Sequence, residues 1–249
     1  MADRRTKLPD DEAAFLDDYR PADFPRPSVA VDLVILTIED CDLRLLTVLR
    51  NEHPFKGKWA LPGGFLRVGP SRTDQGEGLD EAAARELHEE TGLPEGSVFL
   101  EQLRTFGAPG RDPRMRVVSV AYFALVRPTL APLVRPGGDV HKVRWQSVVP
   151  GSAHGLAFDH DGIVSCAIDR IRADLDRSHL AFELVPETFT IQQLRAVHEV
   201  IRGAAIDPGN FRKRFLRMID DGILEQARGK RLTASKPAQV YRFRDRDHG

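Results

Sequence analysis

Residues 77–93 read EGLDEAAARELHEETGL, and this stretch decides how the first half of the chain is interpreted. Its apolar spacing predicts a helix from about Leu79 to Thr91, with Gly92 as the residue that ends it. Three glutamates, at positions i, i+3 and i+4, would share one face of that helix: Glu86, Glu89 and Glu90. Because Mg²⁺ binds carboxylate oxygens together with substrate phosphates, this face indicates a site for a divalent cation and a phosphate compound.

The simpler interpretation of the same glutamates is a charged helix exposed to solvent. The spacing of the neighbouring residues favours the metal site instead. Glu77 is followed after seven residues by Arg85-Glu86-Leu87, then after one residue by Glu89-Glu90, and after one more by Gly92-Leu93. The breaker cluster Pro62-Gly63-Gly64 lies upstream. Together these residues resemble the Nudix box.

The resemblance to the Nudix family implies an α+β fold, a mixed-sheet α/β/α sandwich, and a ligand of the nucleoside-diphosphate class. It also implies bound Mg²⁺ or Mn²⁺ and, in active members, metal-assisted attack of water on the diphosphate. Carried over by position, the metal ligands would be Glu77, Glu86, Glu89 and Glu90. The catalytic residues of an active enzyme would be Glu89, Glu90 and Arg85, with Arg85 orienting a glutamate. One departure is the length of the preceding loop. The family normally has five residues between the box glycine and the first glutamate, whereas Phe65 to Gly76 supplies twelve, so that about residues 70–76 are inserted.

The composition places the chain among intracellular proteins. It has 249 residues, a net charge of -1, and two cysteines, Cys41 and Cys166, too few for a disulfide framework. No apolar run is long enough to span a bilayer, and residues 1–24 form a polar extension without the apolar stretch of a signal peptide. We therefore expect a cytoplasmic protein without a membrane segment.

The charge is distributed unevenly along the chain. Residues 207–249 carry eleven Lys and Arg against six Asp and Glu, a net of +5. Residues 1–206 therefore hold 25 basic and 31 acidic residues, a net of -6. A basic end on an acidic body indicates a polyanionic partner, although a solvated basic face is an equal alternative at this point.

The pattern of the second half predicts a winged helix-turn-helix over residues 156–249. Thr190 and Gln193 form a capping box, Asp207-Pro208 begins a further helix, and two strand-like segments flank a basic loop at 228–231. The helix after Pro208 would bury its phenylalanines and expose a basic face suited to the major groove of DNA. The residues expected to contact DNA are Asn210, Arg212, Lys213, Arg214, Arg217, Lys230 and Arg231. The alternative is a basic helix that docks on its own domain.

A Nudix domain at 25–155 followed by a winged helix resembles the Nudix-related transcriptional regulators of NAD metabolism. The phrases that carry the resemblance, in order, are KGKWALPGGF (56–65), GRDPRMRVVSVAYFALV (110–126), LAFDHDGIV (156–164) and LAFELVPETFTIQQL (180–194). Membership implies a homodimeric repressor of NAD-metabolism genes. It would bind a palindromic double-stranded operator and sense ADP-ribose or a related NAD-derived nucleotide.

Two functions stay open because the carboxylates of the box are intact. The first is a ligand-responsive repressor; the second is a metal-dependent diphosphatase for ADP-ribose-type substrates whose C-terminal domain serves for interaction. Trp59 and Phe106 would either stack a base or pack in the core, and basic side chains would meet the phosphates. The candidate ligand-binding residues are Arg50, Lys58, Trp59, Gly63, Gly64, Arg111 and Arg114.

Overall fold

The structure, a computed structural model, describes residues 10–71, 73–94, 96–137, 142–148, 153–175, 180–232 and 236–244. Its helices are α1 (Asp10–Asp18), α2 (Leu79–Thr91), α3 (His160–Asp174), α4 (Ile191–Arg202) and α5 (Pro208–Asp220), with the short 3-10 helices η1 (Pro21–Asp23), η2 (Ala131–Leu133) and η3 (Leu180–Phe182). Its strands are β1 (Ser28–Glu39), β2 (Asp42–Leu49), β3 (Trp59–Ala60), β4 (Gly63–Phe65), β5 (Phe99–Phe106), β6 (Val117–Leu125), β7 (Val143–Ser147), β8 (Leu224–Arg231) and β9 (Ala238–Phe243).

The first half of the chain is built on a mixed sheet. The strands lie in the order β3-β2-β1-β6-β5, with β4 paired to β1 and β7 paired to β2. β1 and β6 are parallel, whereas the other pairs are antiparallel. The mixed sheet expected from the sequence is therefore confirmed.

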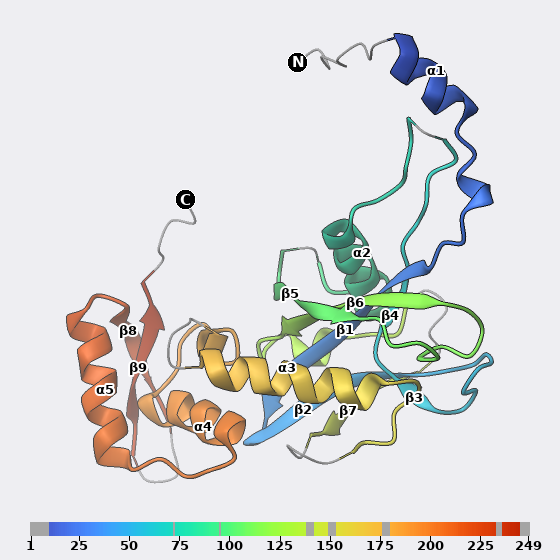
Figure 1. Cartoon of the computed structure of the whole chain (residues 1–249). Helices are drawn as coiled ribbons and strands as arrows, with labels where there is room; N and C mark the ends of the chain where they lie inside the picture. The colour runs from blue at the N-terminus through green and yellow to red at the C-terminus, as the bar shows by residue number, and fades with distance from the viewer. Residues whose placement is uncertain are drawn as a thin grey trace.

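Strand β1 is apolar on both faces because a helix covers each face of the sheet. Val31 and Leu33 belong to the core cluster that includes residues of α2. Val34 and Leu36, which alternate with them along the strand, belong to the cluster that includes residues of α3. Burial of each such side chain contributes about 1.5–3 kcal/mol. The result is the α/β/α sandwich, seen in Figure 1 with α2 and α3 on opposite sides of the strands.

Helix α3 joins the sheet to the C-terminal helices. Its apolar side packs on β1 and β5, and the same core cluster continues into α4 and the phenylalanines of α5. Figure 1 shows α3 crossing beside the sheet toward α4 and α5. The start of the DNA-binding domain at residue 156 stays a prediction, and the packing of α3 on the sheet favours a later start.

The C-terminal helices and strands form the expected winged helix. The capping box of α4 is present: the Gln193 backbone N–H donates to the Thr190 hydroxyl oxygen over 3.2 Å, and the Thr190 N–H donates to the Gln193 side chain over 2.9 Å. Asp207 caps α5 by accepting from the backbone N–H of Asn210. One expectation is wrong. Residues 228–231 belong to strand β8 and not to a loop, because an irregularity after Gln226 lets the pairing with β9 continue.

The inserted residues form a loop whose two ends are hydrogen-bonded to each other. Arg67 and Glu77 are joined at the base by two hydrogen bonds, from the Glu77 backbone N–H to the Arg67 carbonyl and from the Arg67 N–H to the Glu77 carboxylate. Val68 and Gly76 form a bridge one residue further out. Figure 1 shows the segment between β4 and α2 extending away from the sheet. The insertion therefore leaves β4 and α2 side by side.

The polar extension predicted for residues 1–24 contains α1 and η1, and residues 1–9 lie outside the described part. Phe15, Tyr19 and Phe24 are exposed and contact one another, with ring centroids 5.7 Å and 5.5 Å apart. No helix in the described ranges combines the length and apolar character needed to cross a bilayer.

Candidate functional site

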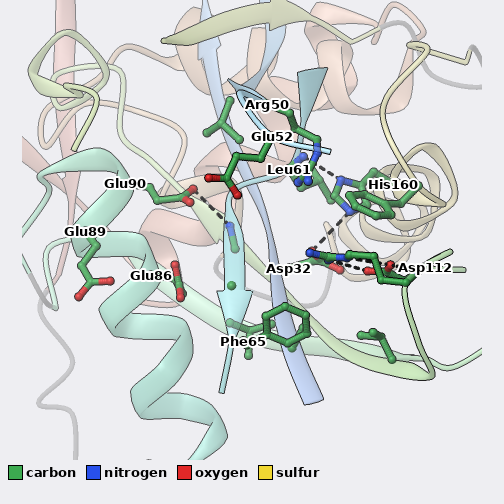
Figure 2. A pocket seen from close by; sticks show the side chains of 18 of the residues that line it. Asp32, Arg50, Glu52, Leu61, Phe65, Glu86, Glu89, Glu90, Asp112 and His160 are labelled. Carbon is green, nitrogen blue, oxygen red and sulfur yellow. Dashed lines mark hydrogen bonds and ion pairs between the residues drawn. The ribbon is translucent and has the colours of Figure 1, made fainter. Parts of the chain in front are cut away.

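A pocket of about 880 Å³ opens between α2, β4, the first half of β1 and the beginning of α3. Figure 2 shows the glutamates of α2 on one side of it and Asp112 and His160 on the other. The predicted residues that line it are Arg50, Gly63, Gly64, Arg85, Glu86, Glu89, Glu90, Arg111 and Arg114. The structure thus brings most of the predicted ligand and carboxylate residues to one place.

Two glutamates of α2, the buried Glu86 and the half-buried Glu90, line this pocket. Glu86 is 8% exposed, and the Glu90 carboxylate accepts a hydrogen bond from the Gly63 backbone N–H over 3.2 Å. Burial, followed by the nearby charge of Glu86, raises the pKa of Glu90 to about 8. Burial also raises the pKa of Glu86. Burial and the neighbouring carboxylate therefore both disfavour the charged form of Glu90.

Arg85 binds three of the carboxylates of the Nudix-like motif. Its guanidinium donates to Glu77 over 2.6 Å and 2.8 Å, to Glu86 over 2.6 Å and to Glu89 over 3.0 Å. The hydrogen bonds from Arg85 lower the pKa of Glu77 to about 2. Glu77, predicted as a metal ligand, is outside the lining of the pocket and joins Arg85 to the base of the insertion.

The chemistry of these donors suits a divalent cation. Glu86, Glu89 and Glu90 line the pocket with carboxylate oxygens, which Mg²⁺ and Mn²⁺ prefer. The absence of a side chain at Gly64 leaves room for the Glu86 carboxylate, since an added Cβ would lie 2.2 Å from one of its oxygens. Within the described ranges, no three His, Cys, Asp or Glu side chains are gathered tightly enough to hold an ion as they stand. Two arginines bind carboxylates at this face: Arg85 binds Glu86 and Glu89, and the Arg67 Nη2 binds Glu89 over 2.8 Å.

The opposite wall contains a buried charged network around the predicted residue Arg111, and its other members, Asp32, Asp159 and His160, were not predicted. Arg111 binds Asp32 over 3.0 Å and Asp159 over 2.7 Å, with its side chain 5% exposed. His160 Nδ1 accepts the Leu61 backbone N–H over 2.9 Å, and its Nε2 lies 3.5 Å from Asp32. Burial lowers the pKa of His160, so this imidazole is neutral. Asp159 and His160 both lie in the phrase LAFDHDGIV (156–164), which carried part of the family resemblance and could have pointed to them.

The other arginines of the pocket lie beside aromatic rings. The Arg114 guanidinium is held by Asp112 and lies 5.5 Å from the centre of the Phe65 ring. Arg50 lies 4.8 Å from the centre of the Phe158 ring. Phe65 and Phe158 both line the pocket and were missed by the sequence analysis.

Three predicted or considered ligand residues lie elsewhere. Trp59 is half-buried against the core and is covered by the Arg144 guanidinium at 3.9 Å. Lys58 is exposed near the Phe55 ring, and Phe106 packs on the core cluster. Packing, the alternative weighed for the two aromatics, therefore describes both Trp59 and Phe106.

The second candidate surface is the exposed side of α5 with the neighbouring wing. Phe211 and Phe215 are buried, as expected from their spacing. The predicted contacts Asn210, Arg212, Lys213, Arg217 and Lys230 are exposed, and Arg214 is half-buried. Arg231 is turned inward: its guanidinium donates to the Gln193 side chain and to the Thr188 carbonyl. Most of the predicted DNA-contact residues thus share a solvent-exposed basic surface.

Comparison with known proteins identifies both parts of the chain. Residues 27–160 match the NUDIX domain family and residues 181–243 match the NrtR DNA-binding winged helix domain. The ADPR responsive transcriptional repressor NtrR of Acinetobacter baylyi is 32% identical over 237 residues, which cover 95% of this chain and 90% of that protein. The chain belongs to the NrtR family of Nudix-domain regulators.

Solved structures of the NrtR family agree with both halves. NrtR of Shewanella oneidensis, complexed with a 27mer DNA, is 30% identical, covers 87% of this chain and 93% of its own, and has a TM-score of 0.68. The NUDIX domain of the same protein, complexed with ADP ribose, is 32% identical, covers 64% of this chain and 98% of its own, and has a TM-score of 0.51. The assignment of a Nudix domain and a winged helix from the sequence is confirmed. Helix α3 lies almost wholly between the two matched regions.

Proposed function

We propose that this NrtR-family chain is a transcriptional repressor that binds operator DNA through its winged helix and ADP-ribose in its Nudix pocket. The observation that carries the proposal is the joining, in one chain, of a pocket lined by arginines and glutamates to an exposed basic helix. An ADPR-responsive repressor similar over nearly the whole chain supports it, as do the relatives complexed with DNA and with ADP ribose.

In the DNA-bound state, α5 lies in the major groove and the wing contacts the backbone. Arg212, Lys213 and Arg217 are exposed along one stretch of α5, where they reach phosphates or base edges. Lys230 extends the basic surface onto β8. A homodimer would place two such helices on the half-sites of a palindromic operator, and genes of NAD metabolism are the proposed targets.

In the ligand-bound state, the diphosphate lies between the arginines and the glutamates. Arg50 and Arg114 provide positive charge at the pocket wall, and the Arg111 network lies beneath them. Glu86, Glu89 and Glu90 would hold Mg²⁺ or Mn²⁺, which when bound neutralises charge on the diphosphate and on the carboxylates. Burial raises the pKa of Glu90, and a cation held beside it would favour its ionised form.

A second function, hydrolysis of ADP-ribose, is favoured by one observation. The insertion loops out at Arg67 and Glu77, so Gly64 stays beside Glu86 and all three α2 glutamates line the pocket. Arg85 and Arg67 both donate to Glu89, and a cation held by the α2 glutamates would share or replace these contacts. The repressor function ranks first because the ADPR responsive repressor is similar over 95% of this chain.

The test is a binding titration on the full chain. A labelled duplex from the region upstream of its own gene is titrated by fluorescence anisotropy with and without ADP-ribose, and AMP with ribose 5-phosphate serves as the matched ligand control. We expect the upstream duplex to bind more tightly than a shuffled duplex, and ADP-ribose alone to change its Kd at least about fivefold. Equal affinity for both duplexes, or no effect of ADP-ribose, would overturn the proposal.

The same preparations decide on hydrolysis. AMP release from ADP-ribose is measured with Mg²⁺ or Mn²⁺ in the wild type and in Glu89→Gln. Turnover at about 1 s⁻¹ or faster that is lost in Glu89→Gln would establish the second function. Slower turnover, unchanged by the substitution, would leave the pocket as a sensor.

A further inference from the structure

Helix α3 begins at the ligand pocket and ends at the turn of the winged helix. Phe158 and His160, at its start, line the pocket. Near its other end, the Arg172 Nε donates a hydrogen bond over 2.7 Å to the carbonyl oxygen of Ile201, in the last turn of α4. Asp159 and Arg172 are thirteen positions apart, so α3 connects two points about 20 Å apart.

The Arg172 contact supports the position of the DNA-contacting helix. The last four carbonyl groups of a helix have no partner within it, and a cation at that end is favourable to the helix dipole. Arg172 satisfies the Ile201 carbonyl, and its Nη2 lies 3.7 Å from where a Cβ on Gly203 would be. Gly203, at φ +68°, ends α4 and begins the turn into α5. A shift of α3 therefore acts on the segment that orients α5.

The pocket end of α3 is tied to Arg111, a charged residue that lines the pocket. Asp159, the residue before the helix, accepts from both Nε and Nη2 of Arg111. The Arg111 Nη2 also donates to Asp32 on β1, so two carboxylates share this guanidinium. In the described part of the chain, Arg111 Nη1 has no hydrogen-bond partner, and it belongs to a residue that lines the pocket. An anionic ligand bound at Nη1 competes with Asp159 for the positive charge and repels its carboxylate.

We propose that α3 transmits occupancy of the Nudix pocket to the winged helix, with the Arg111–Asp159 pair at one end and the Arg172–Ile201 contact at the other. This inference rests on the proposed function, because it concerns how the ligand alters DNA binding. A diphosphate at Arg111 weakens the hold of Arg111 on Asp159 and lets the start of α3 move. Because α3 packs on the sheet by its apolar side, small sliding of the whole helix carries the change to Arg172.

The experiment measures coupling as the ratio of the DNA Kd values with and without saturating ADP-ribose. The full chain is compared with Arg172→Ala and with Arg170→Ala. Arg170 is the matched control, because it is an arginine of the same helix that binds Glu101 of β5 and Asp174 but not α4. We expect a wild-type ratio within the usual range of about 5–150-fold, retained in Arg170→Ala and falling toward unity in Arg172→Ala. ADP-ribose affinity, measured by calorimetry without DNA, should stay within about twofold in both variants.

A second pair of variants locates the other end of the path. Asp159→Asn removes the charge that the ligand repels, so we expect it to lower the ratio as well. If both residues act through α3, the double variant Asp159→Asn with Arg172→Ala loses no more coupling than the more affected single variant. Full additivity of the two losses would place them on separate routes and overturn the inference.

The outcomes separate this inference from the proposed function. A wild-type ratio of unity would contradict the proposed function itself. A wild-type response that Arg172→Ala retains in full would leave the proposed function standing and overturn the role of α3. If Arg172→Ala fails to bind DNA at all, Arg172→Lys, which keeps a cation near the Ile201 carbonyl, is measured in its place. Loss of ligand-free DNA binding in both variants would show that Arg172 only supports the fold, and would also overturn the inference.

Discussion

The raised pKa of Glu90 predicts an unusual dependence of stability on pH, and the substitution Glu90→Gln tests it. Glutamine has the shape of the protonated glutamate and can accept the Gly63 N–H, but it has no charge to bury. In the folded chain the pKa of Glu90 is about 8, against an ordinary value of 4.5. The folded chain therefore holds a proton between these two values that the unfolded chain has released.

The sign and size of the effect follow from this difference in bound protons. As the pH rises from 4.5 toward 8, the free energy of unfolding of the wild type falls by about 1.4 kcal/mol per pH unit from this group. Across the whole window the loss amounts to about 5 kcal/mol, and above pH 8 it no longer grows. Glu90→Gln has no such loss. We expect the difference in stability between the two proteins to be smallest at pH 5 and the variant to be clearly the more stable at pH 8.

Thermal unfolding in EDTA at pH 5, 6, 7 and 8 measures this difference. For a chain of this size the gap between the Tm values should widen by about 3–5 °C per pH unit. Glu89→Gln is the matched control, because the hydrogen bonds from Arg85 and Arg67 lower the pKa of Glu89, against the opposing effect of desolvation. Removing that charge should destabilise the chain at neutral pH, and the difference should vanish as the pH falls through the folded pKa of Glu89.

Parallel Tm curves for the wild type and Glu90→Gln would refute the reasoning, because they would mean that Glu90 ionises at its ordinary pKa. Added Mg²⁺ gives an independent check. A cation bound by the α2 glutamates favours the ionised form of Glu90, so at pH 8 it should raise the Tm of the wild type more than that of Glu90→Gln.

Three further outcomes are expected. Gly63→Ala should lower the free energy of unfolding in urea by roughly 2–4 kcal/mol, because its Cβ would lie 2.2 Å from the Val31 carbonyl oxygen at φ +149°; a near-neutral value would contradict this. Asp32→Ala should cost about 3 kcal/mol in the same assay, since it deprives the buried Arg111 guanidinium of a carboxylate, and wild-type stability would count against the network. Lys213→Ala should weaken binding to all duplexes and reduce the slope of log K against log salt concentration by about 0.9, whereas an unchanged slope would exclude a phosphate contact.

Local chemistry accounts for the elements that the sequence predicted well. Helix α2 spans Leu79–Thr91 as expected, because Gly92 adopts a left-handed conformation that ends it. The Thr190 capping box and the Asp207 cap likewise depend on residues three positions apart. Such interactions lie within one turn of the chain, so the sequence contains all the information needed to predict them.

The composition of the pocket was decided by tertiary packing. Arg111 enters it and Lys58 does not, although both are basic residues in loops, because β1 and the start of α3 supply Asp32 and Asp159 as partners for Arg111. His160 reaches the site only because α3 packs on the sheet, 99 residues along the chain from Leu61, which it contacts. No spacing rule connects positions so far apart.

The stretch at 77–93 shows both contributions together. From the sequence alone, Glu86, Glu89 and Glu90 were placed on one helical face and assigned to a Nudix-type site, because helical periodicity requires it. Only the folded chain shows that Glu90 is half-buried near Glu86 and has a raised pKa, while Arg85 holds Glu89. Burial and neighbouring charge, which depend on the β4 backbone folding against α2, decide the protonation of a carboxylate that the sequence could only locate.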